Sequence, residues 1–356
     1  MPPLRPLARS VGLVAFALTA CDSDPAPEDV FAEAEANVGE WTWIDVEGST
    51  CRDGSDTGFG IRLQEGANDL MIYLEGGGAC FNASTCRTNP STYGEDEFNA
   101  RIPTRGNAGI LDASDAANPV ADWNAVYVPY CTGDIHGGTD AAATVPGVST
   151  TQRFVGHRNV ERVLDLVAPY VGTPDRLLLV GVSAGGFGTL VNFVEVADRF
   201  DGATLILLND SGPILFADDV FSPSIGTTIA DLYSLPGAFP PDASALFQPD
   251  GLQGIYTYLA ERYPDARFGL ASYLQDQTIR DFFAFGQPDA IMGYEYAAAL
   301  RDLRANLPDA WATYYAPGEA HVFTDYPDRY TGVVGGVALN DWLQMLLEGS
   351  ARNVAP

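Results

Sequence analysis

Residues 177–188 constrain this chain more than any other stretch, because they combine a strand, a sharp turn and a helix around one serine. The apolar residues 177–180 predict a short buried strand. Residues 181–185, Gly-Val-Ser-Ala-Gly, fit the G-x-S-x-G pattern, and residues 190–200 have apolar side chains near helical spacing. This order predicts a strained turn that presents Ser183 above the sheet edge as a nucleophile. A purely structural turn between strand and helix is the alternative.

A glycine-rich segment after an earlier predicted strand supplies a second element of the same chemistry. Residues 74–80 are Leu-Glu-Gly-Gly-Gly-Ala-Cys. Ester hydrolysis needs backbone N–H groups directed at the oxygen that becomes negative. The candidate donors are Gly77, Gly78 and Ala184, the last being the residue after the nucleophile. A phosphate-binding loop or a plain turn is the alternative, but the chain has no lysine and no Walker-type spacing.

The general base has to be one of three histidines, namely His136, His157 and His321. In α/β-hydrolases the base follows the nucleophile late in the chain. We therefore expect His321, which comes after a predicted last strand at 311–315, to be the base. His157 lies on a predicted amphipathic helix and is expected to be structural. His136 lies in a loop after a strand, where it either faces the substrate or is a satisfied loop residue.

The acidic partner of the base is less well defined by the sequence. It should lie between serine and histidine, in a loop or short segment beside the last strands. Asp210, Asp276, Asp281 and Asp289 all qualify by position. Most acidic residues of such a chain are merely solvated, so position alone leaves these four open.

Alternating strand and helix patterns indicate an α/β fold with a mostly parallel sheet flanked by helices. Strands are expected at 58–63, 70–74, 125–128, 177–180, 203–208 and 311–315, and helices at 151–170, 190–200, 291–307 and 333–347. Residues 217–254 are rich in Pro, Gly and Phe, which predicts a cap or a substrate-facing insertion. Residues 41–356 are expected to form a single catalytic domain.

The N-terminus has the features of a targeting signal. Residues 1–20 combine Arg5 and Arg9 with an apolar run too short to span a bilayer, and Leu-Thr-Ala-Cys, ending at Cys21, resembles a lipobox. We expect cleavage before Cys21 and lipidation of it, which would anchor an exported protein to a bacterial membrane, in the periplasm or at the cell surface. An ordinary signal peptide is the alternative. The acidic residues 21–40 predict a flexible tether.

The chain has four further cysteines, which indicate the redox state of its compartment: Cys51, Cys80, Cys86 and Cys131. An even number in an oxidising compartment favours two disulfides. The closeness of Cys80 and Cys86 favours a bond between them, which leaves Cys51 to pair with Cys131. A zinc site is the alternative, but the spacing does not suit paired C-x-x-C motifs and no histidine is nearby in the sequence. No metal is expected, and no cofactor.

The charge of the chain bears on its partners. A formal net charge of −28 argues against nucleic acid or an anionic surface as a partner. The lipid anchor is then the expected contact with a membrane. The composition leaves the oligomeric state open.

Several of these segments together resemble one family. Residues 75–86 are similar to a segment of the pectin acetylesterase and Notum family, as are the segments that begin at Cys51, Val128, Gly181 and Asp210. The resemblance covers residues 51–321, and the joint set of motifs is more specific than any one of them. It implies an α/β-hydrolase-like fold and a serine carboxylesterase that uses no metal.

The resemblance also implies roles for individual residues. Ser183 is then the nucleophile and His321 the base, with Gly77, Gly78 and Ala184 as oxyanion donors. The family has an aspartate shortly after an aromatic-rich helix, which favours Asp276 as the acid, with Asp281 second. Ala79 departs from the family, because plant members carry tryptophan at this position. That departure concerns the shape of the acyl pocket, and so the substrate.

Residues and resemblance together predict one function with two alternatives. The predicted reaction removes short acyl groups, above all acetyl, from an extracellular carbohydrate polymer through an acyl-enzyme. A lipid-type protein deacylase like Notum is the first alternative. An inert, surface-anchored binding protein is the second, and the presence of both Ser183 and His321 argues against it.

Overall fold

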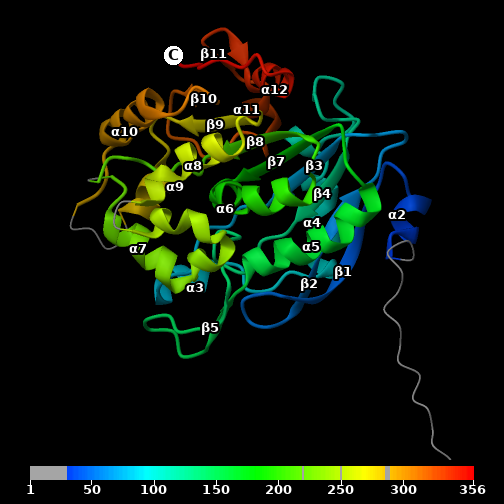
Figure 1. The fold of residues 1–356 in the computed structure, drawn as a ribbon, viewed down its shortest axis with the longest axis horizontal. Helices are drawn as coiled ribbons and strands as arrows, with labels where there is room; N and C mark the ends of the chain where they lie inside the picture. Colours follow the sequence, from blue (N-terminus) through cyan, green and yellow to red (C-terminus); the bar gives the residue numbers. More distant parts are fainter. Residues whose placement is uncertain (1–29, 219, 249–250, 285–288) are drawn as a thin grey trace, which may run out of the picture.

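The computed structural model describes residues 30–218, 220–248, 251–284 and 289–356, so the expected signal sequence and Cys21 lie outside the described residues. Its centre is an eight-stranded sheet in the order β1-β2-β4-β3-β7-β8-β9-β10 (Figure 1). The six strands from β4 to β10 are parallel, and β1 and β2 are antiparallel at one edge. The predicted α/β class with a mostly parallel sheet is confirmed.

The bounds of the elements follow the chain. The strands of the central sheet are β1 Trp41–Thr50, β2 Asp56–Arg62, β3 Leu70–Leu74, β4 Asn124–Val128, β7 Arg176–Val182, β8 Thr204–Asp210, β9 Arg267–Tyr273 and β10 Trp311–Ala316. Two hairpins are formed by β5 Asp140–Ala143 with β6 Gln152–Phe154, and by β11 Val333–Val334 with β12 Val337–Ala338. The helices are α2 Ala32–Ala36, α3 Ala83–Thr88, α4 Glu95–Arg105, α5 Gly156–Val171, α6 Ala184–Arg199, α7 Pro223–Leu232, α8 Ile255–Arg262, α9 Gln277–Phe283, α10 Gly293–Asn306, α11 Pro327–Tyr330 and α12 Leu339–Glu348.

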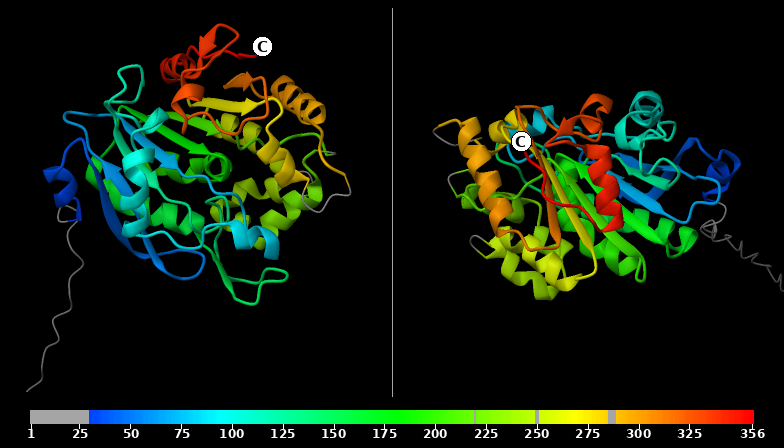
Figure 2. Two further views of the ribbon diagram at one scale, coloured as in Figure 1. Left: turned by 180° about the vertical axis from the view of Figure 1, so that it is seen from behind. Right: turned by 90° about the horizontal axis from the view of Figure 1, so that it is seen from above.

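Both faces of the sheet are covered by helices, which explains why its central strands β3, β4 and β7 are mainly apolar. Alternate side chains of β3 belong to two different core clusters, with Ile72 in one and Tyr73 in the other. The first cluster includes side chains of α5, α6, α8 and α10. The second includes side chains of α4 and α12. The ribbons of these two helices lie on the side shown from behind in Figure 2. The carboxyl ends of the parallel strands thus open at one edge, where sites form in open α/β sheets.

Two strands of the central sheet, β9 and β1, were not expected. β9 is buried along almost its whole length between β8 and β10, so it lacks the alternation that marks a half-exposed strand. β1 pairs at the antiparallel edge, and its pattern is broken by charged residues. The helix expected at 151–170 begins only at Gly156, because residues 152–154 form β6. The helix expected at 333–347 begins only at Leu339, after the β11–β12 hairpin.

The end of the expected tether is packed onto the domain instead. α2 follows Phe31, which is fully buried and stacks on Tyr170 of α5 with a ring-centroid distance of 3.9 Å. One aromatic side chain supplies a contact that the acidic composition of the segment conceals. The expectation of a flexible tether up to residue 40 is therefore wrong from about Phe31 onward. Among the described residues, no helix is both long and apolar enough to cross a bilayer.

The expected disulfide pairing is confirmed. Cys51 is bonded to Cys131, and Cys80 is bonded to Cys86. The first bond joins the loop after β1 to the loop after β4. The second closes a short loop directly after the glycine-rich segment, so it restrains the backbone that the sequence predicts to bind an oxyanion.

Candidate active site

Ser183 lies at a sharp turn between β7 and α6, as the sequence predicts. Its backbone has φ 56° and ψ −117°, a conformation that L-residues adopt only under strain. A Cβ at Gly181 would lie 2.2 Å from the carbonyl oxygen of Gly185, and one at Gly185 would lie 2.0 Å from that of Leu74. Only glycine fits either position, because strand and helix approach too closely for any side chain. The G-x-S-x-G pattern is thus explained by packing around Ser183.

A cavity of about 330 Å³ opens beside Ser183. Its lining includes all the residues that the sequence assigns to nucleophile, base and oxyanion donors, together with Ala79: Ser183, His321, Gly77, Gly78, Ala184 and Ala79. These residues come from the loop after β3, the start of α6 and the loop after β10. The fold therefore brings together three segments that are far apart in the sequence.

His321 has the geometry of a general base held by a carboxylate. Its Nδ1 donates to Oδ2 of Asp276 at 2.7 Å, and Asp276 is fully buried. A neutral ring with its proton on Nδ1 has a lone pair on Nε2. Nε2 is buried and has no hydrogen-bond partner within the part of the chain that the structure describes. The lone pair is thus available to a proton donor in the cavity that Ser183 also lines.

The other three candidate acids have different surroundings. Asp281 and Asp289 are exposed. Asp210 is buried, and its Oδ2 accepts hydrogen bonds from the backbone of Phe323 and Thr324. It therefore holds the loop that carries His321 without touching the imidazole. Asp276 also accepts from the N–H of Ile279 at 3.0 Å, which caps α9 and fixes the carboxylate.

Hydrogen bonds and packing determine the shape of the glycine-rich loop. The carbonyl of Gly77 accepts from the Asn89 amide at 2.8 Å, and that of Gly78 accepts from the Tyr130 hydroxyl at 2.7 Å. A Cβ at Gly77 would lie 2.4 Å from the Tyr130 ring, so this position requires glycine. The bond between Cys80 and Cys86 follows directly. A loop held on both sides in this way can present donors without reorganising, which is what oxyanion stabilisation requires.

A buried charge cluster that the sequence did not reveal lies at Glu75, where the glycine-rich loop begins. Oε1 of Glu75 accepts from Arg105 at 2.8 Å, and Oε2 accepts from the backbone N–H of Tyr130 at 3.0 Å. Burial raises the pKa of the Glu75 carboxyl, and Arg105 opposes that shift. Arg105, Asp325 and Tyr326 also line the cavity. No local pattern marks these residues, because helix α4 and the loop after β10 meet only in the folded chain.

His136 does not line the cavity beside Ser183, so the expectation that it contacts substrate is wrong. It is buried, and its Nε2 lies 2.8 Å from the backbone carbonyl of Glu75. A carbonyl can only accept, so Nε2 carries the proton. His136 thus supports the strand end from which the glycine-rich loop departs. The sequence could not distinguish this role from a substrate contact, because both place a histidine in a loop after a strand.

The buried His136 gives a testable dependence of stability on pH. Burial lowers its pKa to about 4, against about 6.5 for an unperturbed histidine. As the pH falls from 6.5 to 4, the imidazole of the unfolded chain is protonated while that of the folded chain stays neutral, so the folded state loses stability. The full shift corresponds to about 3 kcal/mol of unfolding free energy. We expect the wild type to lose this amount relative to His136→Gln between pH 7 and pH 4, measured by urea denaturation.

One opposing group is present in both proteins of that comparison. Burial raises the pKa of Asp134 to about 6, so its protonation stabilises the folded state as the pH falls. The contribution of Asp134 is the same in wild type and variant, so it cancels when their unfolding free energies are subtracted. The remaining difference in unfolding free energy reports on His136. A difference that stays constant from pH 7 to pH 4 would contradict the buried neutral imidazole.

A second, apolar chamber adjoins the cavity. The two share the residues Ala79, Ile135, Phe187 and Phe282. The chamber has a volume of about 50 Å³ and only apolar side chains around it, several of them from the segment 217–254 that was expected to face the substrate. The chamber therefore lies where the acyl part of an ester at Ser183 could extend, and Ala79 forms part of its wall.

Fold and cavity together define a class of protein with the α/β-hydrolase arrangement of strand, serine turn and helix. Residues 33–235 match the family described as Pectinacetylesterase, which is more than half of the chain. The chain belongs to the pectinacetylesterase family.

Individual relatives agree with this assignment. The chain is 34% identical over 156 residues to the palmitoleoyl-protein carboxylesterase Notum of Mus musculus, covering 43% of this chain and 30% of the relative. It is 30% identical over 196 residues to pectin acetylesterase 4 of Arabidopsis thaliana, covering 53% of this chain and 47% of the relative. These alignments span less than half the length of either relative.

A solved structure extends the similarity to nearly the whole fold. The structure of the Wnt deacylase Notum from Drosophila superimposes with a TM-score of 0.67 and 21% identity. The superposition covers 88% of this chain and 95% of that chain. At this identity the similarity concerns the fold, and its coverage of 88% of the chain extends beyond the matched family residues 33–235.

Proposed function

We propose that this protein is a serine carboxylesterase that removes short acyl groups, above all acetyl, from an extracellular carbohydrate polymer. The observation that carries the proposal is the bond between Nδ1 of His321 and Asp276, which leaves Nε2 of His321 unpartnered among the described residues, in the cavity that Ser183 lines. Membership of the pectinacetylesterase family favours an acylated carbohydrate as substrate.

The proposed mechanism uses these residues in turn. His321 takes the proton of Ser183 on Nε2 while the serine oxygen attacks the ester carbonyl. The backbone N–H groups of Gly77, Gly78 and Ala184 stabilise the negative oxygen of the tetrahedral intermediate. His321 then gives the proton to the leaving alcohol, and water releases the acyl group by the reverse sequence. Asp276 keeps the imidazole in the required tautomer and stabilises its charged form.

Turnover of p-nitrophenyl acetate tests the reaction class. Measurable hydrolysis would exclude the alternative of an inert binding protein, and its absence would overturn the proposal. The polymer is tested separately by acetyl release from acetylated pectin, xylan and chitin. Release from none of the three, with p-nitrophenyl acetate still hydrolysed, would contradict the carbohydrate and leave an esterase of another substrate class.

The apolar chamber favours a second candidate, an enzyme that removes longer acyl chains. Its lining has the character of a fatty-acyl site, and one relative is named a palmitoleoyl-protein carboxylesterase. Its volume of about 50 Å³, however, leaves little room for a chain of many carbons as the side chains are packed. We therefore place short acyl groups first and treat chain length as the quantity to measure.

Phe282 is the side chain through which chain length can be altered. It lies in α9 and lines both the cavity and the chamber. Truncating it opens the passage between the two, so Phe282→Ala is expected to raise the ratio of octanoate to acetate hydrolysis by about tenfold or more, since each buried methylene is worth about 0.8 kcal/mol. The measurement is kcat/KM for p-nitrophenyl esters of increasing length.

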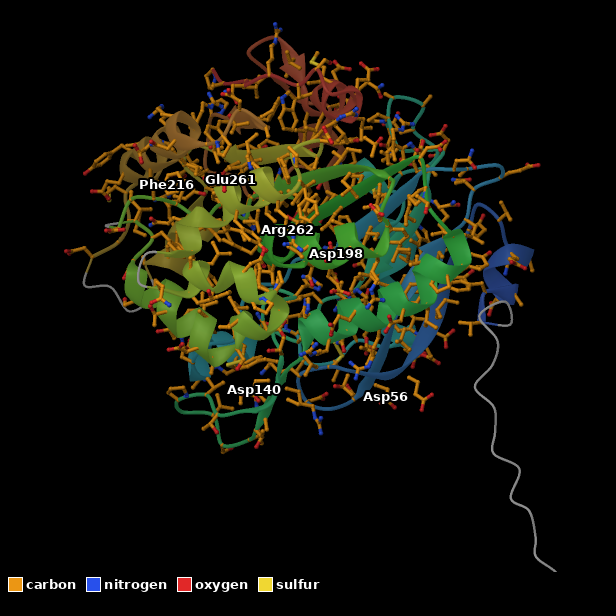
Figure 3. All side chains as sticks on the ribbon, in the orientation of Figure 1. Asp56, Asp140, Asp198, Phe216, Glu261 and Arg262 are labelled. Carbon is orange, nitrogen blue, oxygen red and sulfur yellow. A yellow bond between two sulfur atoms is a disulfide. The ribbon has the colours of Figure 1, made fainter. Side chains whose placement is uncertain are left out.

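A matched truncation elsewhere controls for loss of packing. Phe216, labelled in Figure 3, packs on Tyr256 and lines neither space. Phe216→Ala should leave the octanoate-to-acetate ratio unchanged. An equal change of that ratio in both variants would contradict the assignment of the chamber to the acyl chain.

We also propose that the protein is exported and held to a membrane by a lipid on Cys21. Two disulfides support an oxidising compartment, and the lipobox-like sequence supports the anchor. Mass spectrometry of the N-terminal peptide from the membrane fraction tests this: a lipid-modified Cys21 is expected, and an unmodified residue or cleavage at another position would contradict it.

A further inference from the structure

A histidine and two glutamates converge on one another outside the cavity. His157 and Glu161 lie on α5 with i,i+4 spacing, and Glu195 lies on α6. The two helices pack side by side on one face of the sheet (Figure 1). One potential ligand atom from each residue lies within 4.8 Å of the other two. None of the three lines the cavity beside Ser183.

The hydrogen bonds of Asn192 orient the imidazole of His157. The amide nitrogen of Asn192 donates to the carbonyls of His136 and Gly188 at 2.8 and 2.9 Å. Its Oδ1 is therefore an acceptor, and Nδ1 of His157 donates to it at 2.8 Å. In the neutral ring the lone pair on Nε2 then faces the two glutamates. A histidine with one nitrogen bound in this way is typical of metal ligands.

Distances and burial support the same interpretation. His157 is only 2% exposed. Its Nε2 lies 3.7 Å from Oε1 of Glu161, which is too long for a hydrogen bond. Two ligands of one tetrahedral ion are about 3.3 Å apart when each bond is about 2.0–2.1 Å long. Small rotations of the flexible glutamate side chains close the remaining distance.

We propose that His157, Glu161 and Glu195 bind a divalent cation of the zinc type, with water completing its coordination. Imidazole and carboxylates are suitable ligands for zinc. The cysteines gave no sign of a metal, and none of these three ligands is a cysteine. The present ligands become neighbours only when α5 and α6 pack.

Two arginines currently neutralise the glutamates and have to be displaced. Arg158 contacts both oxygens of Glu161 at 2.7 and 3.0 Å, and Arg199 contacts Glu195 at 2.9 Å. Their side chains are 44% and 34% exposed, and ion pairs of this kind contribute little to stability. Arg199 retains Asp165 as a partner when it leaves Glu195. Removing Arg158 should therefore tighten metal binding.

The site is connected to the glycine-rich loop by a short chain of hydrogen bonds. The imidazole of His157 donates a hydrogen bond to Asn192, and the Asn192 amide donates one to the backbone carbonyl of His136. The ring of His136 in turn donates one to the backbone carbonyl of Glu75. A bound ion therefore restrains α5 against α6, the helix that starts after Ser183. Its expected role is to stabilise this part of the fold. The proposal does not depend on ester hydrolysis, because the ion contacts no reacting atom.

The proposal is tested by titration with zinc chloride. The full mature chain is purified without a histidine tag and stripped of metal with EDTA beforehand. Isothermal titration calorimetry is expected to give one site per chain. Zinc at about a hundred times its Kd should raise the melting temperature by roughly 4 °C for a chain of this size. No binding, or no rise in melting temperature, would overturn the site.

Variants show whether the bound zinc uses these ligands. Glu161→Gln and Glu195→Gln remove partly exposed carboxylates, so they should fold and should weaken binding by about tenfold or more. Arg158→Gln should tighten it. Glu261→Gln is the matched control, since Glu261 is an exposed carboxylate on α8, labelled in Figure 3. Equal zinc affinity in the three glutamate variants would contradict the proposed ligand set.

Discussion

Ser183→Ala is expected to reduce hydrolysis of p-nitrophenyl acetate by more than about a thousandfold, since removing the nucleophile of a serine hydrolase removes most of its catalysis. Among the side chains described around the cavity, Ser183 is the one hydroxyl that lies on the strained turn before a helix N-terminus. The substitution removes a single oxygen, and alanine loses no packing there. The variant should therefore fold and melt like the wild type.

The measurement combines rate, labelling and stability. Steady-state kinetics give the loss in kcat, and a fluorophosphonate probe should label the wild type at Ser183 and leave the variant unlabelled. Ser149→Ala, at an exposed serine outside the cavity, serves as the control and should keep full activity. A Ser183→Ala enzyme within about tenfold of wild type would mean that another group attacks the ester.

Asp276→Asn is expected to lower kcat by about a thousandfold or more while leaving the fold intact. The carboxylate accepts the Nδ1 proton of His321, which keeps the lone pair on Nε2 and stabilises the imidazolium. An asparagine amide can present a donor to Nδ1 instead, and the ring then carries its proton on the wrong nitrogen. The result separates a catalytic from a structural role, because asparagine caps a helix about as well as aspartate. The cap of α9 at Ile279 should thus survive.

Asp281→Asn provides the comparison within the same helix. Asp281 is exposed on α9 and does not contact His321, so this variant should keep wild-type kcat. The ordering of the two variants is the test. Loss of activity in Asp281→Asn with retention in Asp276→Asn would reverse the assignment. Wild-type rates in both would require a different partner for His321.

Local chemistry was sufficient to predict several parts of this protein. Gly181 precedes the serine because a Cβ there would meet the backbone of Gly185, and this constraint acts between residues only four positions apart. The disulfide between Cys80 and Cys86 is likewise a local matter, since its cysteines are only six residues apart. Strands such as β3 were predictable because a continuous apolar run is itself the signal.

Contacts between distant segments account for what the sequence did not determine. Four aspartates qualified by position as the acid. The family resemblance favoured Asp276, and its contact with His321 forms because α9 packs beside the loop after β10. His136 was open to two roles, and burial against the carbonyl of Glu75 decided between them.

The strand β9 and the cluster around His157 illustrate the same limit. β9 was missed because a strand buried between two others has no alternation to reveal it. Glu195 approaches His157 only when α6 lies against α5. The sequence by itself thus determined the serine turn, the glycine-rich loop and the disulfide between Cys80 and Cys86, whose constraints act mainly between neighbouring residues. Tertiary structure decided the contact between Asp276 and His321, the surroundings of His136 and the His157 cluster, because those depend on side chains that folding brings together.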